Sequence, residues 1–296
     1  MSFSASDAAF EGFRQVRRHP LALVYWAVAY AAVMGLAFLI AGPLFIDVMS
    51  RAEALKGVID PSMTDLEGMG RSYATLFALV MPLALVFSAV LSAAVARAVL
   101  RPSEKSFGYM RLGADELRVL GVSILLGLVI AAAWLMGCVL VSLVAGVAGA
   151  TGIGLLWIPA VLLGVGVVVA VAWLSVRLSL AVPIVVAERR FTLFASYALT
   201  KGHTLALLGM AIIAGVMTLL VSLLGAIVAM PITAISGGAE LMTELGGQDV
   251  MQILAHAWPA ILSWILVNAI LSALQLAVLY APFSAAYRDI KGLPHL

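Results

Sequence analysis

Six long apolar runs dominate the chain, and short polar segments separate them. Each run holds more than 20 mostly apolar residues, which is the length that a helix needs to cross a bilayer. Backbone groups in lipid must bond to one another, so such runs predict helices rather than open strands. The sequence therefore predicts an all-α polytopic membrane protein with one integral membrane domain. Its six transmembrane helices are expected at about 21–46, 73–96, 119–148, 155–187, 204–235 and 259–281.

The fourth run is too long for one straight crossing. Its 33 residues would extend about 50 Å as a helix, whereas the hydrocarbon core is about 30 Å thick. Two features inside the run suggest how the chain accommodates the excess length. Either Arg177 lies within the inner leaflet, or the helix continues past the membrane after a kink near Pro183, since proline disrupts a helix.

Composition supports the membrane assignment and narrows the class of protein. Hydrophobic residues make up 64% of the chain and charged residues only 11%, with a mean hydropathy of +1.14, whereas a soluble domain carries roughly 25% charged residues. These values exclude a disordered chain and a nucleic-acid-binding protein. The single cysteine, Cys138, excludes an internal disulfide framework.

The positions of the charges predict the orientation. Of the 17 Lys and Arg residues, 14 lie in the N-terminal segment, the second and fourth connections and the C-terminal tail. The other three, Arg51, Lys56 and Arg71, share the first connection with five acids. Basic residues stay in the cytoplasm during insertion. We therefore expect a bacterial-type inner-membrane protein with both termini in the cytoplasm.

An internal repeat is predicted from the segments that precede the odd-numbered spans. Phe10, Phe13, Arg17 and His19 match residues 184 positions later, and the middle copy near Tyr109 is weaker. Aromatic residues spaced by three beside basic residues are typical of a short helix in the membrane interface. We therefore predict three pseudo-repeats, each an interfacial helix followed by a two-helix hairpin. The alternative is that any interfacial segment shows such a composition.

The same segments carry a family resemblance. The lead-in Phe194-Ala-Ser-Tyr197-Ala-Leu-Thr-Lys-Gly-His203, the exit from Pro183 to Arg190 and the closing Tyr287-Arg288-Asp289 resemble a broad family of bacterial six-span inner-membrane proteins. Its relatives include the membrane domain fused to some glycerophosphodiester phosphodiesterases. The catalytic barrel of those enzymes is a separate domain, so the resemblance implies the fold and no catalytic residues.

Catalytic chemistry is not indicated by the sequence. The spans carry no Asp, Glu, Lys or His at mid-depth, where proton-coupled carriers place them. No Gly-x-Ser-x-Gly, P-loop or His-Glu-x-x-His motif occurs, and the four histidines have no metal-ligand spacing. We therefore expect a non-enzymatic protein without a cofactor or metal.

Five polar residues in or beside the spans are candidate functional residues. Arg97 and Arg177 would either snorkel to the interface or contact headgroup phosphates between helices. Asn268, Ser272 and Gln275 share one face of the sixth span. They would either form hydrogen bonds between helices or line a polar substrate path.

The segments 47–72 and 236–258 are expected to be outer loops that hold short amphipathic helices, such as 249–257. Together these features favour a protein that interacts with membrane lipids, with a membrane-protein partner or with copies of itself, in envelope homeostasis. The alternative is a permease or channel for a small or lipidic substrate.

Overall fold

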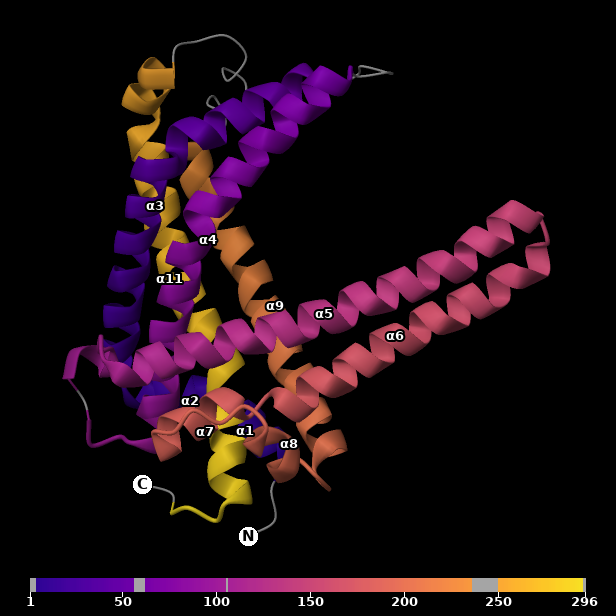
Figure 1. Cartoon of the computed structure of the whole chain (residues 1–296). Helices are drawn as coiled ribbons and strands as arrows, with labels where there is room; N and C mark the ends of the chain where they lie inside the picture. The colour runs from indigo at the N-terminus through magenta and orange to yellow at the C-terminus, as the bar shows by residue number, and fades with distance from the viewer. Residues whose placement is uncertain (1–3, 56–61, 105, 236–249, 295–296) are drawn as a thin grey trace.

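Six candidate membrane spans are present, and every regular element of the described chain is a helix. The computed structural model describes residues 4–55, 62–104, 106–235 and 250–294 (Figure 1). The multi-pass prediction is therefore confirmed. The spans are α3 (Pro20–Ala54), α4 (Met63–Leu100), α5 (Ala114–Thr151), α6 (Trp157–Leu178) followed by α7 (Ala181–Glu188), α9 (Thr204–Ile235) and α11 (Val250–Ile290).

Most of the first predicted outer loop is helical. α3 continues to Ala54 and α4 begins at Met63, so the segment 47–72 mainly extends these two helices. The Ser62 hydroxyl accepts a hydrogen bond from the Asp65 amide at 3.2 Å and so caps α4. Across the two helices, the Ser72 hydroxyl donates to Asp47 Oδ2 at 2.9 Å. Of the second outer segment, 236–249 lies outside the described residues, and 250–257 form the first turns of α11.

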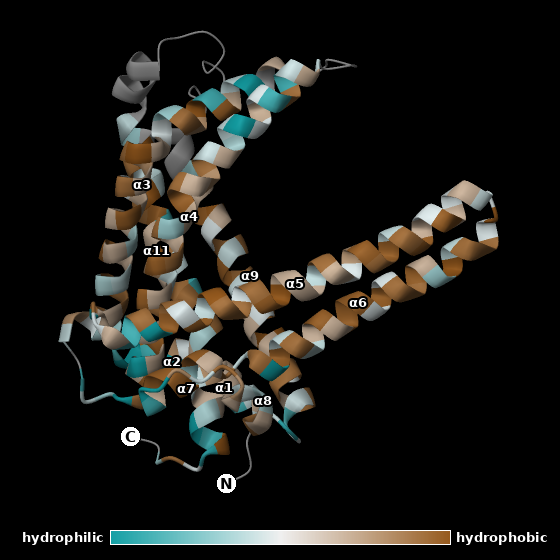
Figure 2. Ribbon diagram, viewed as in Figure 1, coloured by the Kyte–Doolittle hydropathy of each residue, from teal (hydrophilic) through white to brown (hydrophobic). Residues whose placement is uncertain are grey.

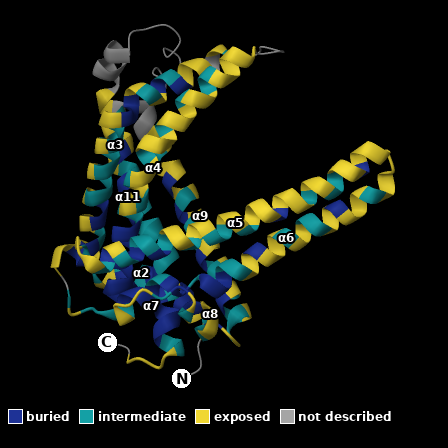
Figure 3. Cartoon of the chain, in the orientation of Figure 1, coloured by how far each residue is buried: buried dark blue, intermediate teal, exposed yellow. Residues whose placement is uncertain are grey.

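The helices separate into two groups. Figure 1 shows α3, α4, α9 and α11 gathered together, with the hairpin of α5 and α6 leaving them obliquely. The hairpin is apolar around its surface (Figure 2) and is exposed along most of its length (Figure 3). Gly137 lets α5 approach α6 closely, because a Cβ there would overlap the Val167 side chain. In a membrane protein such exposed apolar surface contacts lipid.

Tight packing is concentrated at one end of the molecule, the end at which the chain both begins and finishes. Figure 3 shows the buried residues gathered there, and its largest cluster includes Trp26, Leu180, Ile184 and Met210. We call this the basic end. It consists of α1 (Ala5–Ala9), α2 (Glu11–Arg18), the single turn η1 (Ser106–Tyr109), α7, α8 (Ala195–Leu199) and the adjoining ends of the spans.

The segments that precede the odd-numbered spans differ from one another. α2 and α8 are short α-helices, but η1 is one turn with a left-handed backbone at Phe107 (φ 47°) and Gly108 (φ 63°). The buried face of α2 holds Gly12, where a Cβ would lie 2.5 Å from the Val278 Cα of α11. α2 therefore packs its backbone against protein. The threefold repeat stays a prediction.

Candidate functional site: two buried arginines at the basic end

The fourth span breaks just before Pro183. Proline has no amide hydrogen, and its ring clashes with the carbonyl four residues earlier, which here belongs to Ser179. Accordingly α6 ends at Leu178 and α7 begins at Ala181. At the break the Arg177 carbonyl and the Leu180 amide bond to groups outside the helix. The predicted kink near Pro183 is thus a break between two helices, and it lies directly after Arg177.

Two hydroxyls of the α8 segment satisfy the freed backbone groups. The Leu180 amide donates to Ser196 Oγ at 3.1 Å, and this hydroxyl donates to the Arg177 carbonyl at 2.8 Å. The Thr200 hydroxyl lies 3.3 Å from the same carbonyl. Both residues are fully buried. These bonds fix α8 against the end of α6 and place its aromatic residue Tyr197 over Arg177.

The Arg177 side chain is enclosed by aromatic rings and a hydroxyl. Its Cζ lies 4.1 Å from the centre of the Tyr197 ring and 5.3 Å from that of Trp173, distances typical of cation–π contacts. Nη1 donates to Thr200 Oγ1 at 3.5 Å. The residue is only 8% exposed. Within the described chain, Nε has no hydrogen-bond partner and no carboxylate forms an ion pair with this guanidinium.

Arg97 is buried in a different environment. It is 1% exposed, and its Nη2 donates to Glu116 Oε1 at 2.5 Å. Nη1 donates to the carbonyl of Tyr109. Glu116 Oε2 in turn accepts a hydrogen bond from the Gly113 amide at 3.0 Å, which closes the first turn of α5. Arg97 therefore joins the end of α4 to the start of α5 through protein groups.

Around Arg97, the basic end holds a network of charges with more cations than anions. Glu104 lies within 4 Å of four guanidinium groups, at 2.9 Å from Arg111 and 3.3 Å from Arg189. Asp115 pairs with Arg118 at 2.7 Å. Among the described residues of this network, five arginines share three carboxylates, which leaves two positive charges in excess: Arg97, Arg101, Arg111, Arg118 and Arg189 against Glu104, Asp115 and Glu116.

Arg101 ties this network to α7. Its Nη2 donates to the Ala187 carbonyl at 3.0 Å, near the C-terminus of that helix, where a cation is favourable. Burial and the neighbouring Arg189 lower the pKa of Arg101 from its usual value. The pKa of a free guanidinium lies so high that Arg101 keeps its charge at neutral pH.

The three polar residues of the sixth span lie on α11, away from the two arginines in sequence. Gln275 Nε2 donates to the Ser222 hydroxyl of α9 at 3.0 Å, a bond between helices. Asn268 Nδ2 donates to the Trp264 carbonyl of its own helix at 2.9 Å. Ser272 is half-buried. Between Asn268 and Ser272, Leu271 of α11 packs against Gly225 of α9. The structure thus engages Gln275 and Asn268 with protein groups.

Sequence reasoning singled out the two arginines but missed the groups around them. The acids Asp115 and Glu116 precede the third apolar run, and acidic residues in the first turn of a helix are a recognisable signal. Trp173 lies one helical turn before Arg177, which is the spacing of side chains that share a helix face. The hydroxyls of Ser196 and Thr200 gave no signal, because their role depends on the helix break.

Searches for related proteins gave no match, whether against family models, curated proteins or solved structures. Among the residues described, no three His, Cys, Asp or Glu side chains gather as metal ligands. The resemblance to six-span bacterial proteins therefore stays a prediction, and the site has to be interpreted from its own geometry.

Proposed function

We propose that this chain is a non-enzymatic inner-membrane protein that binds the phosphate of anionic phospholipids at Arg177, with both termini in the cytoplasm. The proposal rests on two properties of the Arg177 guanidinium in the described chain: it is buried, and no carboxylate pairs with it. A guanidinium that is 8% exposed and has no carboxylate partner among the described residues is costly to desolvate alone. An anion supplied by the membrane would remove that cost.

The groups around Arg177 suit a phosphate better than another anion. The rings of Tyr197 and Trp173 contact the guanidinium, and Thr200 accepts from Nη1. The edge formed by Nε and Nη2 has no hydrogen-bond partner among the described residues. This edge presents the parallel pair of N–H donors that binds phosphate oxygens. We infer that the lipid phosphate approaches this edge.

The position of the site fits a headgroup. Trp173 and Tyr197 are 47% and 41% exposed, and both aromatic types concentrate at the level of lipid headgroups. Phe194, one turn before, is 76% exposed. Lys201 is exposed nearby and adds a cation that attracts the anionic leaflet.

The acids of the network around Arg97 support a role without catalysis. Glu104, Asp115 and Glu116 are each held by at least one arginine. Carboxylates occupied in this way are poorly placed to transfer protons as a general acid or base.

The test is lipid-dependent stabilisation of the purified protein. We expect phosphatidylglycerol to raise the apparent melting temperature in detergent more than phosphatidylcholine with the same acyl chains, because only the first is anionic. Arg177→Met should reduce this difference, and Arg177→Lys should reduce it less, since lysine keeps the charge but loses the paired donors.

Arg18→Gln is the matched control, because Arg18 is an exposed arginine at the same end of the molecule. It should leave the difference between the two lipids unchanged. An Arg177→Met protein that folds and still prefers phosphatidylglycerol as strongly as the wild type would contradict the proposal.

A further inference from the structure

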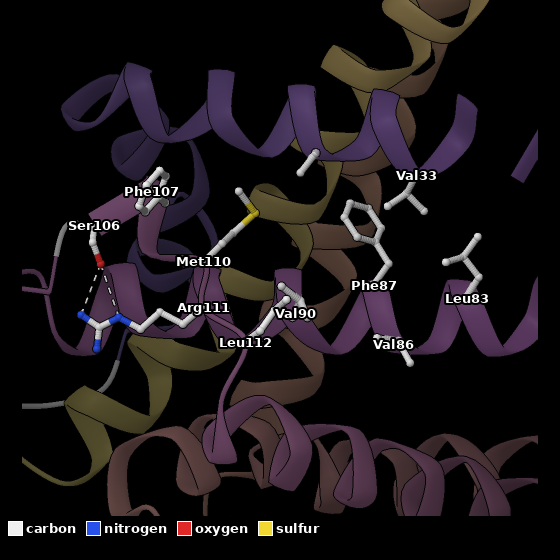
Figure 4. Close-up of a pocket in the computed structure, with 11 residues that line it drawn as sticks. Val33, Leu83, Val86, Phe87, Val90, Ser106, Phe107, Met110, Arg111 and Leu112 are labelled. Atoms are coloured by element: carbon white, nitrogen blue, oxygen red, sulfur yellow. Dashed lines mark hydrogen bonds between the residues drawn. The ribbon is translucent and has the colours of Figure 1, made fainter. Parts of the chain in front are cut away.

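A groove of 740 Å³ lies between α3 and α4, on helices that do not contribute to the Arg177 site. Its walls are apolar along most of its length. Figure 4 shows Val33 on one side and Leu83, Phe87 and Val90 on the other. From Leu83 to Val90 the wall advances about 10 Å along α4. The rim residue Val86 is 45% exposed, so the groove opens at the surface of the spans.

One end of the groove is polar and cationic. Arg111 and Ser106 line this end, and the guanidinium donates from Nε and Nη2 to the Ser106 hydroxyl at 3.4 Å (Figure 4). Arg111 also pairs with Glu104 at 2.9 Å, but that carboxylate is shared with three other arginines. The positive charge at this end therefore exceeds what the carboxylate neutralises.

The end wall is a firmly anchored piece of backbone. Phe107, Gly108 and Tyr109 all have positive φ angles, a conformation that costs energy in residues other than glycine. Two buried donors hold it in place. Trp26 Nε1 donates to the Gly108 carbonyl at 2.7 Å, and Arg97 donates to the Tyr109 carbonyl. At Gly108 a side chain would also meet the Tyr25 Cβ at 2.8 Å.

We propose that this groove binds one acyl chain of an anionic phospholipid, with the lipid phosphate on Arg111 at the polar end. An apolar channel that ends at a cation matches an amphiphile of this charge, and the exposed faces of α3 and α4 contact lipid in the membrane. The proposal uses different residues from the Arg177 site, so either one can fail while the other holds.

The experiment counts bound lipids by native mass spectrometry, after titration with phosphatidylglycerol or phosphatidylcholine of equal chain length. Arg111 is 46% exposed in its side chain, so Arg111→Gln should fold normally. We expect this variant to bind phosphatidylglycerol at least about fivefold more weakly, because a charge-assisted phosphate contact is lost. Binding of phosphatidylcholine should change little.

A second variant tests the apolar part of the groove. Ala29 lines it, whereas the neighbouring Val28 is 63% exposed and does not. Ala29→Phe should fill the groove and remove one bound lipid of either type, and Val28→Phe should remove none. Arg177→Met should leave the groove lipid in place, which separates this proposal from the proposed function.

Three outcomes would overturn the inference. One is an Ala29→Phe protein that is folded and retains every lipid of the wild type. Another is an Arg111→Gln protein whose preference for phosphatidylglycerol is undiminished at the groove. The last is a dimer that Ala29→Phe dissociates, which would show that a second copy of the chain occupies the groove.

Discussion

Arg97 and Arg177 are both arginines near the basic end of a span, and the protein buries them in opposite ways. Arg97 is 1% exposed and its charge is matched by Glu116 at 2.5 Å. Arg177 is 8% exposed and meets two aromatic rings and a hydroxyl, without a carboxylate in the described chain. One arginine is neutralised by the protein, and the other keeps an uncompensated charge.

The difference comes from the segment that the chain brings back after each span. After α4 the chain turns through η1 and returns with the acidic start of α5. After α6 the break before Pro183 is repaired by the hydroxyls of Ser196 and Thr200, and the same segment brings Tyr197. A buried arginine at a span end therefore indicates a ligand site only when its neighbours leave the charge unmatched.

The largest effect is expected where the pair at Arg97 is broken. Glu116→Gln removes the closest counter-charge of a buried guanidinium, and removing one partner of a buried pair costs about 3–5 kcal/mol. The apparent melting temperature should fall by several degrees in any lipid, because Arg97 acts through protein groups. Tryptophan fluorescence during heating measures this directly.

Asp115→Asn is the control for that change, since Asp115 is the neighbouring residue and pairs with the partly exposed Arg118. Pairs of this kind contribute about 0–1 kcal/mol. Equal losses for Glu116→Gln and Asp115→Asn would show that burial of Arg97 does not distinguish the two pairs.

The sequence predicts the six spans well because lipid imposes a simple requirement on each of them, a long apolar helix. It also identifies Arg97 and Arg177 as charged residues in or beside apolar runs. It does not predict which of them is neutralised, because the Arg97–Glu116 pair depends on the left-handed turn at Phe107 and Gly108. Nor does apolarity locate helix ends, since α3 and α4 continue into polar sequence at 47–72.

One substitution should give Arg177 the kind of carboxylate partner that Arg97 already has. Thr200 Oγ1 lies 3.5 Å from Arg177 Nη1, so Thr200→Asp places a carboxylate beside the guanidinium. The arginine remains, but its charge is matched, and binding of phosphatidylglycerol should weaken by roughly tenfold, or about 1.4 kcal/mol. Lipid titration followed by thermal unfolding measures the change.

Thr200→Ala separates the new charge from the lost hydroxyl. It removes the bonds to the Arg177 carbonyl and side chain without adding a carboxylate. We expect it to lower stability in all lipids while the preference for phosphatidylglycerol persists. If Thr200→Asp bound phosphatidylglycerol as tightly as Thr200→Ala, the missing counter-charge would not explain recognition at Arg177.

The smallest effect is expected from the ring that covers Arg177. Tyr197→Ala removes the closer of its two aromatic contacts, worth about 1 kcal/mol at a partly exposed site, whereas Tyr197→Phe keeps the ring. Unfolding in detergent should therefore show a loss for alanine and almost none for phenylalanine. Within the described residues the cation–π contacts involve Arg177 and not Arg97, so the effect belongs to one arginine of the pair. Equal losses for both substitutions would assign the stabilisation to the tyrosine hydroxyl. That result would contradict a stabilising contact between the Tyr197 ring and Arg177.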